Sequence, residues 1–180
     1  MAWSSRSFNR AITYPRSEPR LLLCQTCWMR VLLRPSTGCF TANGVVYATA
    51  GQSVDALNAS TGALLWTFAT RDNSGSSPAV ANGVVYVGAN FGTLYALDAT
   101  SGAQLWSAHL IHYGNSPAVA NGVVYVTSNQ ELYALNARTG AKLWVYKNNP
   151  VSDFLVYPAV SNGMLYVGDS SYYQLAFGLK

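Results

Sequence analysis

The chain has 180 residues, of which 50% are hydrophobic, 13% aromatic and only 10% charged, with a formal net charge of +4. This composition excludes intrinsic disorder as the state of the whole chain, and the length is sufficient for a buried core. Six arginines and one glutamate lie within residues 1–40, whereas residues 41–180 carry five basic and six acidic side chains. The basicity therefore belongs to the N-terminal segment, and we predict no nucleic-acid partner.

Residues 1–38 are predicted to form an irregular basic segment, whose order stays open. The C-x-x-C sequence at 24–27 has no second cysteine pair, which argues against a zinc or redox site. Residues 21–33 do not make a convincing signal peptide, because Gln25 and Arg30 interrupt the apolar run. No stretch of the chain reaches the length of a transmembrane helix.

From residue 39 onward the chain is an internal repeat. The phrase Asn-Gly-Val-Val-Tyr occurs three times and returns as Asn-Gly-Met-Leu-Tyr, with its glycine at positions 44, 83, 122 and 163. A second phrase, Thr/Ser-Gly-Ala-x-Leu-Trp, occurs three times, with its tryptophan at positions 66, 106 and 144. Two interleaved phrases that share one period establish a repeat of about 40 residues.

Each unit is predicted to contain four short antiparallel strands. In the second unit a strand at 77–81 is followed by Asn82-Gly83, which is a strong signal for a two-residue hairpin turn. The apolar run at 84–89 indicates a strand buried on both faces. An alternating strand at 93–98 and an outer strand at 103–108 complete the unit, and the outer strand carries the tryptophan.

Four antiparallel strands in about 40 residues are typical of one blade of a β-propeller. We therefore predict an all-β fold with about 3.5–4 blades. A β-helix repeats at a shorter period, and a β-sandwich has no reason to repeat its sequence. The fourth unit lacks an outer strand, since its third strand is expected at 174–177. The predicted units span residues 39–76, 77–115, 116–156 and 157–180.

Residues 96–106 resemble the tryptophan-docking motif of pyrroloquinoline-quinone (PQQ)-like propeller repeats, Ala-x-Asp-x-x-Thr-Gly-x-x-x-Trp. Residues 56–66 and 134–144 match it with asparagine in place of aspartate, and the resemblance covers about residues 39–180. It implies a turn that the glycine and the Asp or Asn side chain stabilise, and a tryptophan that lies between its own blade and the next. The structural residues so implied are Trp66, Trp106, Trp144, Gly62, Gly102, Gly140, Asn58, Asp98 and Asn136.

Two arrangements of the blades stay open. The spacing from Trp28 to Gly44 equals the spacing from Trp106 to Gly122, so residues 27–33 are a candidate closing strand for a compact four-blade ring. The alternative is that the chain is part of a larger propeller whose remaining blades lie outside it. The resemblance favours this alternative, because propellers of this family usually have seven or eight blades.

The chain does not show the site that the resemblance would bring with an enzyme. Quinoprotein dehydrogenases hold PQQ and Ca²⁺ with acidic and amide ligands, next to a disulfide of adjacent cysteines, and this chain has no adjacent cysteines. Its acids are scattered: Asp98 is expected in a turn, Asp55 and Glu131 in loops that lead into strands, and Asp169 at the end of a strand. We predict no catalytic, cofactor or metal site, with PQQ and Ca²⁺ relevant only to the enzyme alternative.

Two further pairs of residues are assigned to the scaffold. His109 and His112 are at positions i and i+3 of an extended segment, which places them on opposite faces and argues against a shared metal. Tyr172-Tyr173 suggests a stacking platform, but we favour Tyr173 as the repeat of Tyr95 and Tyr133 in the blade core.

The sequence as a whole favours a non-catalytic PQQ-like propeller module for protein interaction or scaffolding, with an unidentified protein partner. The alternatives are a fragment of a PQQ-dependent dehydrogenase and a ligand-sensing propeller domain of a larger receptor. The low charge, the many small polar residues and the lack of cysteine in residues 41–180 favour a periplasmic, cell-surface or secreted bacterial protein.

Overall fold

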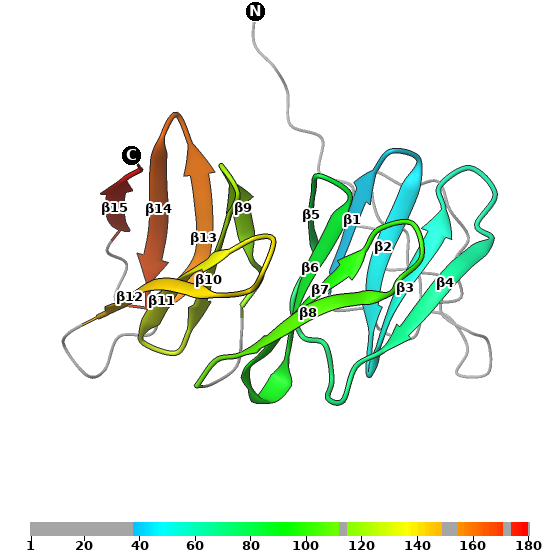
Figure 1. Cartoon of the computed structure of the whole chain (residues 1–180), viewed down its shortest axis with the longest axis horizontal. Helices are drawn as coiled ribbons and strands as arrows, with labels where there is room; N and C mark the ends of the chain where they lie inside the picture. Colours follow the sequence, from blue (N-terminus) through cyan, green and yellow to red (C-terminus); the bar gives the residue numbers. More distant parts are fainter. Residues whose placement is uncertain (1–37, 112–114, 149–154, 171–173, 180) are drawn as a thin grey trace, which may run out of the picture.

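The computed structural model describes residues 38–111, 115–148, 155–170 and 174–179, which form four antiparallel sheets (Figure 1). The first sheet contains β1 (Gly38–Ala42), β2 (Val45–Ala50), β3 (Ser53–Asn58) and β4 (Leu64–Ala69). The second contains β5 (Ala79–Ala81), β6 (Val84–Ala89), β7 (Thr93–Asp98) and β8 (Gln104–His109). The third contains β9 (Ala118–Ala120), β10 (Val123–Ser128), β11 (Glu131–Asn136) and β12 (Lys142–Lys147). The fourth contains β13 (Leu155–Ser161), β14 (Met164–Asp169) and β15 (Gln174–Gly178).

The predicted all-β fold and its hairpin connections are confirmed. Asn82 and Gly83 have φ angles of 51° and 75°, and the other three Asn-Gly pairs repeat these values closely. Positive φ at both turn positions matches the right-handed twist of the strands that the turn connects. A single 3₁₀ turn is present in the described part of the chain, at Asn90–Gly92, where it connects β6 to β7.

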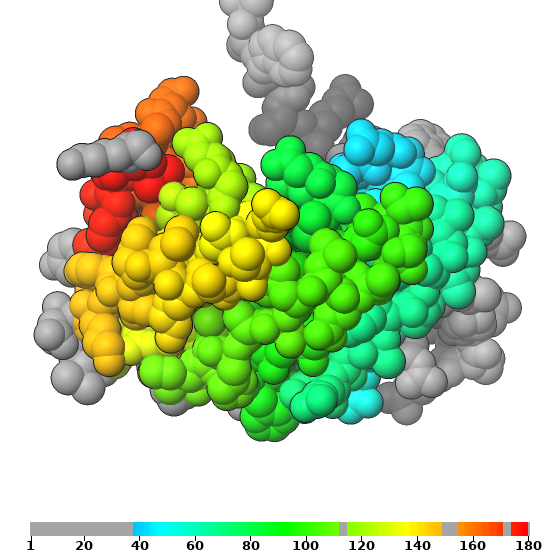
Figure 2. All heavy atoms as spheres, viewed as in Figure 1, coloured from blue at the N-terminus to red at the C-terminus, as the bar shows by residue number. Residues whose placement is uncertain are grey.

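The hydrophobic core lies between the sheets rather than within one of them. One cluster joins Tyr47, Val54 and Trp66 of the first sheet to Val87 and Tyr95 of the second. Similar clusters join the second sheet to the third and the third to the fourth. The sheets therefore pack face to face in chain order, as blades do, and Figure 2 shows them side by side from the cyan first blade to the red end of the fourth.

The third strand of the second blade is more deeply buried than its sequence indicates. The alternation in β7 suggests two different faces, but Leu94, Tyr95, Ala96 and Leu97 are all buried. Tyr95 and Leu97 face the first blade, while Leu94 and Ala96 face the third. A strand enclosed between two neighbouring sheets needs apolar side chains on both faces.

The fourth blade has three strands, so the outer strand that was expected to be missing is absent from the described residues. Its outward face is uncovered. Tyr166 is 41% exposed, whereas the corresponding Tyr47, Tyr86 and Tyr125 are 3–4% exposed beneath a following blade. The four blades therefore form an open arc.

The strand register corrects two predictions. Val87 pairs with Tyr95 and Val167 pairs with Leu175, so Leu175 and not Tyr173 takes the position of Tyr95 in the fourth blade. Asp55 lies inside β3 opposite Ala48, and Glu131 is the first residue of β11 opposite Ser128, rather than either lying in a loop that leads into the strand.

Candidate functional site

Two side chains of the first blade donate hydrogen bonds to one main-chain carbonyl group of the second blade. The Trp66 indole Nε1 donates a hydrogen bond to the Ala99 carbonyl oxygen at 3.0 Å, and the Tyr47 hydroxyl donates to the same oxygen at 3.2 Å. Tyr47 and Trp66 belong to the first blade, and Ala99 follows the third strand of the second. A carbonyl oxygen has two lone pairs and can accept both bonds.

The second and third blades repeat this arrangement. Trp106 Nε1 donates to the Ala137 carbonyl oxygen at 3.0 Å, and the Tyr86 hydroxyl donates to it at 3.1 Å. We call each set of tyrosine, tryptophan and carbonyl acceptor an interblade clasp. The tyrosine is the member that the sequence analysis did not assign, although the phrase Asn-Gly-Val-Val-Tyr repeats it in step with the tryptophan.

Trp66 and Trp106 each lie against the glycine of the following motif copy, not against the glycine of their own. A Cβ atom on Gly102 would lie 2.6 Å from the Trp66 ring, and one on Gly140 would lie 2.6 Å from the Trp106 ring. Both glycines also have positive φ, of 73° and 71°. The glycine therefore meets two demands at once, a left-handed turn and space for an indole.

The Asp or Asn side chain of each motif organises the turn. Asp98 Oδ1 accepts hydrogen bonds from the amides of Thr100 and Ser101 at 3.0 and 2.8 Å. Asn58 and Asn136 Oδ1 accept the equivalent pairs of bonds. The bonds from Ser101 are the main reason that the pKa of Asp98 lies below its ordinary value. These turns hold the carbonyl groups that the clasps use.

Trp144 differs from the other two motif tryptophans. Its side chain is 37% exposed, against 9% for Trp66, and its ring lies 6.3 Å from the ring of Phe177. An apolar groove of about 570 Å³ opens beside it. The groove is lined by Val123, Tyr125, Trp144, Val145, Tyr146, Phe177, Gly178 and Leu179.

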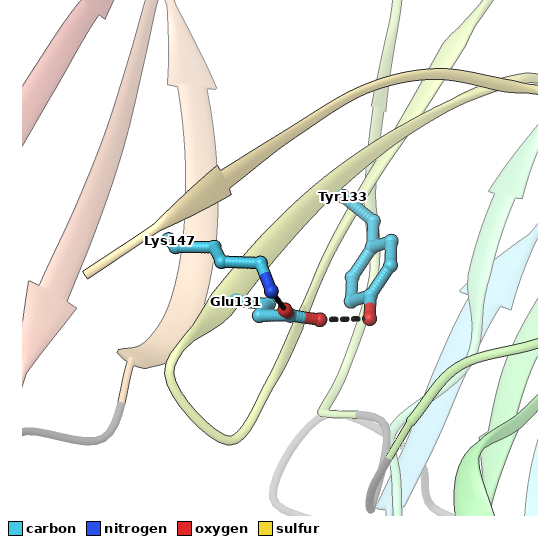
Figure 3. Close-up of polar contacts among 3 residues, drawn as sticks. All are labelled: Glu131, Tyr133 and Lys147. Atoms are coloured by element: carbon cyan, nitrogen blue, oxygen red, sulfur yellow. Dashed lines mark hydrogen bonds and ion pairs between the residues drawn. The ribbon is translucent and has the colours of Figure 1, made fainter. Parts of the chain in front are cut away.

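A polar cluster in the third blade has no counterpart in the first two. Glu131, at the start of β11, pairs with Lys147 at 2.9 Å and accepts a hydrogen bond from the Tyr133 hydroxyl (Figure 3). Lys147 and Tyr133 approach the carboxylate from opposite sides. Lys142 Nζ lies 4.9 Å from the centre of the Tyr133 ring, a cation–π contact. The positions of Glu131 and Tyr133 hold Thr93 and Tyr95 in the second blade.

The cluster shifts the pKa of the Glu131 carboxyl group and the pKa of the Tyr133 hydroxyl group. Burial of Glu131 favours its neutral form, but hydrogen bonds from Tyr133 and Lys147 and the charges of Lys147 and Lys142 outweigh burial and lower the pKa. Burial, followed by the bond to Glu131 and its charge, raises the pKa of Tyr133 to about 12. At neutral pH the phenol is therefore a hydrogen-bond donor to a carboxylate.

This cluster predicts an acid dependence of stability. Because the folded protein holds the pKa of Glu131 below its ordinary 4.5, the resulting stabilisation is complete above pH 4.5 and is lost as the pH falls through the folded pKa. We expect Glu131→Gln to lose stability less steeply than the native chain below pH 4.5, measured by urea unfolding at several pH values. Parallel curves for the two proteins would contradict this assignment.

Most of the remaining candidates lie outside the described residues. His109 is the exposed last residue of β8, while His112, the 24–27 sequence and Tyr172-Tyr173 lie outside the described residues. Within the described ranges no three His, Cys, Asp or Glu side chains gather in a group that could hold a metal ion.

A family model described as "Outer membrane protein assembly factor BamB" matches residues 50–177. The chain belongs to this family. The match contains the three motif tryptophans. It also contains both interblade clasps apart from Tyr47, which precedes the matched residues. It thereby agrees with the resemblance to PQQ-like propeller repeats.

The individual relatives include a quinone-type dehydrogenase as well as a BamB protein. The dehydrogenase subunit of the quinone-type alcohol dehydrogenase of Gluconobacter oxydans is 40% identical over 81 residues, covering 38% of this chain and 11% of that protein. BamB from Moraxella catarrhalis is 24% identical with a TM-score of 0.70, over 80% of this chain and 47% of that one. The designed protein Ika8 is 14% identical with a TM-score of 0.72, over 80% and 46%. The chain thus spans less than half of each, and the last two likenesses show the propeller fold alone.

Proposed function

We propose that this chain is a non-catalytic module of PQQ-like propeller repeats that serves protein interaction or scaffolding. The observation that carries the proposal is the match over residues 50–177 to a family described as an assembly factor. The interblade clasps support it, because the repeated motifs are engaged in joining blades and the loops between strands stay available for a partner.

The acidic side chains of the blades also support a scaffold. Asp98 is engaged by its own turn, and Glu131 by Tyr133 and Lys147. A calcium ion takes six to eight oxygen ligands, several of them carboxylates. Among the described residues no three His, Cys, Asp or Glu side chains gather in one place, which supports a scaffold rather than a calcium site.

A second candidate is a fragment of a PQQ-dependent dehydrogenase. The 40% identity to the Gluconobacter oxydans subunit favours it. Because the chain spans only 11% of that protein, this candidate places the quinone site in blades other than those described here.

We also propose an extracytoplasmic bacterial setting for this module. The family description names the outer membrane, and the low charge of the repeats agrees with export. Among the described residues there is no helix of the length and apolarity that crossing a membrane requires.

A titration of this chain with PQQ and CaCl₂ tests the proposal that it is a non-catalytic scaffold. For a scaffold we expect no change in the quinone absorbance and no rise in the unfolding temperature of the chain. A ligand present at 100 times its Kd would stabilise the folded state by about 2.7 kcal/mol, which calorimetry detects readily. The apo form of a quinoprotein dehydrogenase serves as the positive control. Stoichiometric binding to this chain would overturn the scaffold proposal and would show that the chain itself carries a quinone site.

A further inference from the structure

The connection between β6 and β7 differs from its counterparts in the flanking blades. Residues 51–52 join β2 to β3, and residues 129–130 join β10 to β11. The second blade instead uses three residues, Asn90, Phe91 and Gly92, which form the 3₁₀ turn at the lower end of the blade in Figure 1. The flanking blades show that the same two strands can be joined without the additional residue.

Phe91 is both exposed and held in an unfavourable backbone conformation. Its φ and ψ angles are 60° and 20°, in the left-handed region that bulky side chains rarely adopt. Gly51 and Asn129, which have φ angles of 59° and 57° in the flanking connections, tolerate this region far better. The Phe91 side chain is 66% exposed and belongs to none of the hydrophobic clusters of the described residues. The fold therefore gains little from an aromatic residue here, and backbone strain of this kind is concentrated at functional sites.

A second exposed apolar side chain belongs to the same end of the second blade. The main-chain N–H of Leu110 donates a hydrogen bond to the Gly92 carbonyl oxygen at 2.6 Å, and that of Ile111 donates to the Tyr133 hydroxyl. The Leu110 side chain is buried, whereas the Ile111 side chain is 59% exposed. These main-chain bonds hold Ile111 to the 3₁₀ turn on one side and to the third blade on the other.

The charged groups around these two side chains balance one another. Glu131, which accepts the hydrogen bond of the Tyr133 hydroxyl, pairs with Lys147 at 2.9 Å. Arg71 and Asp72 carry opposite charges on the connection from the first blade, and a main-chain bond joins this connection to the first residue of the 3₁₀ turn. Surroundings without net charge favour an uncharged apolar ligand over an ionic one.

We propose that Phe91 and Ile111, here called the docking pair, bind a polypeptide that offers an uncharged apolar pocket. The aromatic ring enters the pocket and Ile111 lies at its rim. A few large side chains carry most of the binding energy in protein interfaces, and side chains that are already held in place lose less entropy on binding. The inference rests on the proposed function, since it names the surface with which the scaffold binds a protein.

Selection of random linear peptides displayed on phage tests the docking pair on the full chain. We expect the selected peptides to be rich in aromatic and aliphatic residues and to carry no net charge. Because the contact is apolar, the Kd of the synthetic peptides should change little between low and high NaCl concentration. A library that yields no binder, or charged peptides that dissociate at high salt, would overturn the proposal.

Phe91→Asn is the decisive variant, because Asn129 already occupies a left-handed position in the equivalent connection of the third blade. We expect an unfolding temperature at or above that of the native chain and peptide binding at least about tenfold weaker. Ile111→Ser should weaken binding by a smaller factor. Leu105→Ser is the matched control, because Leu105 is 53% exposed on the outer strand β8, and it should leave the Kd unchanged.

Two results with the Phe91→Asn variant would refute the docking pair. Unchanged peptide binding would show that the ring is not at the contact, and a clear fall in unfolding temperature would show that the ring belongs to the fold. These results are distinguishable from a failure of the proposed function. A chain that binds no quinone and whose peptides ignore Phe91 retains the scaffold proposal and loses only the docking pair. Quinone binding by a chain whose peptides depend on Phe91 would overturn the scaffold proposal and retain the docking pair.

Discussion

Trp66→Ala is expected to lower the stability of the chain by about 3–5 kcal/mol, the usual loss when a buried tryptophan is truncated. The Trp66 side chain is 9% exposed, and it contributes to the core between the first two blades. The substitution also removes one of the two hydrogen bonds to the Ala99 carbonyl. For a chain of this size the loss corresponds to a fall of about 10 °C in unfolding temperature, measured by scanning calorimetry.

Trp144→Ala provides the control for this prediction. The same atoms are removed from the same position of the motif, but the Trp144 side chain is 37% exposed beside an open groove. Less apolar area is lost from the core, so we expect a penalty of about 1–2 kcal/mol. Equal losses in the two variants would show that the clasp between the first two blades adds nothing to ordinary packing.

Gly102→Ala is expected to be nearly as damaging as the loss of the tryptophan. An alanine in the left-handed conformation costs about 1–2 kcal/mol. Its Cβ would also lie 2.6 Å from the Trp66 ring, and displacing a packed indole costs about a further 1–3 kcal/mol. Gly83→Ala separates the two effects, because Gly83 has a φ of 75° but no atom within 4 Å of the added Cβ. We expect it to lose about 1–2 kcal/mol in urea unfolding.

The strands of the blades were predictable because their signals are local. Residues 84–89 and 93–98 coincide with β6 and β7, since turn residues with positive φ bound the hairpin between the second and third strands. The outer strand begins at Gln104 rather than at residue 103, because the Ala103 carbonyl accepts a hydrogen bond from Asp98 within the turn.

The contacts between blades were harder to predict, because they join residues that are far apart in the chain. Repetition shows that Tyr47 is constrained, but its acceptor lies 52 residues away and is a main-chain atom that leaves no signature in the sequence. The motif likewise assigns Gly102 to a turn without showing that the tryptophan of the preceding motif copy lies on it.

Two errors of the sequence analysis arose from judging residue type without counting the register. Tyr173 resembles Tyr95 in kind, but the interval that leads from Tyr86 to Tyr95 leads from Tyr166 to Leu175. Asp55 is predicted in a loop that leads into a strand, yet it pairs with Ala48 in the middle of β2 and β3.

The central claim is that the first and second blades are each held to the next by an indole that lies on the glycine of the following motif copy. The most direct measurement is the difference in free energy of unfolding between Gly102→Ala and Gly83→Ala under identical conditions. The two substitutions share the change and the backbone conformation, and they differ in the tryptophan that the new Cβ meets. We predict that Gly102→Ala is less stable by about 2 kcal/mol. Equal stabilities of the two variants would contradict the claim.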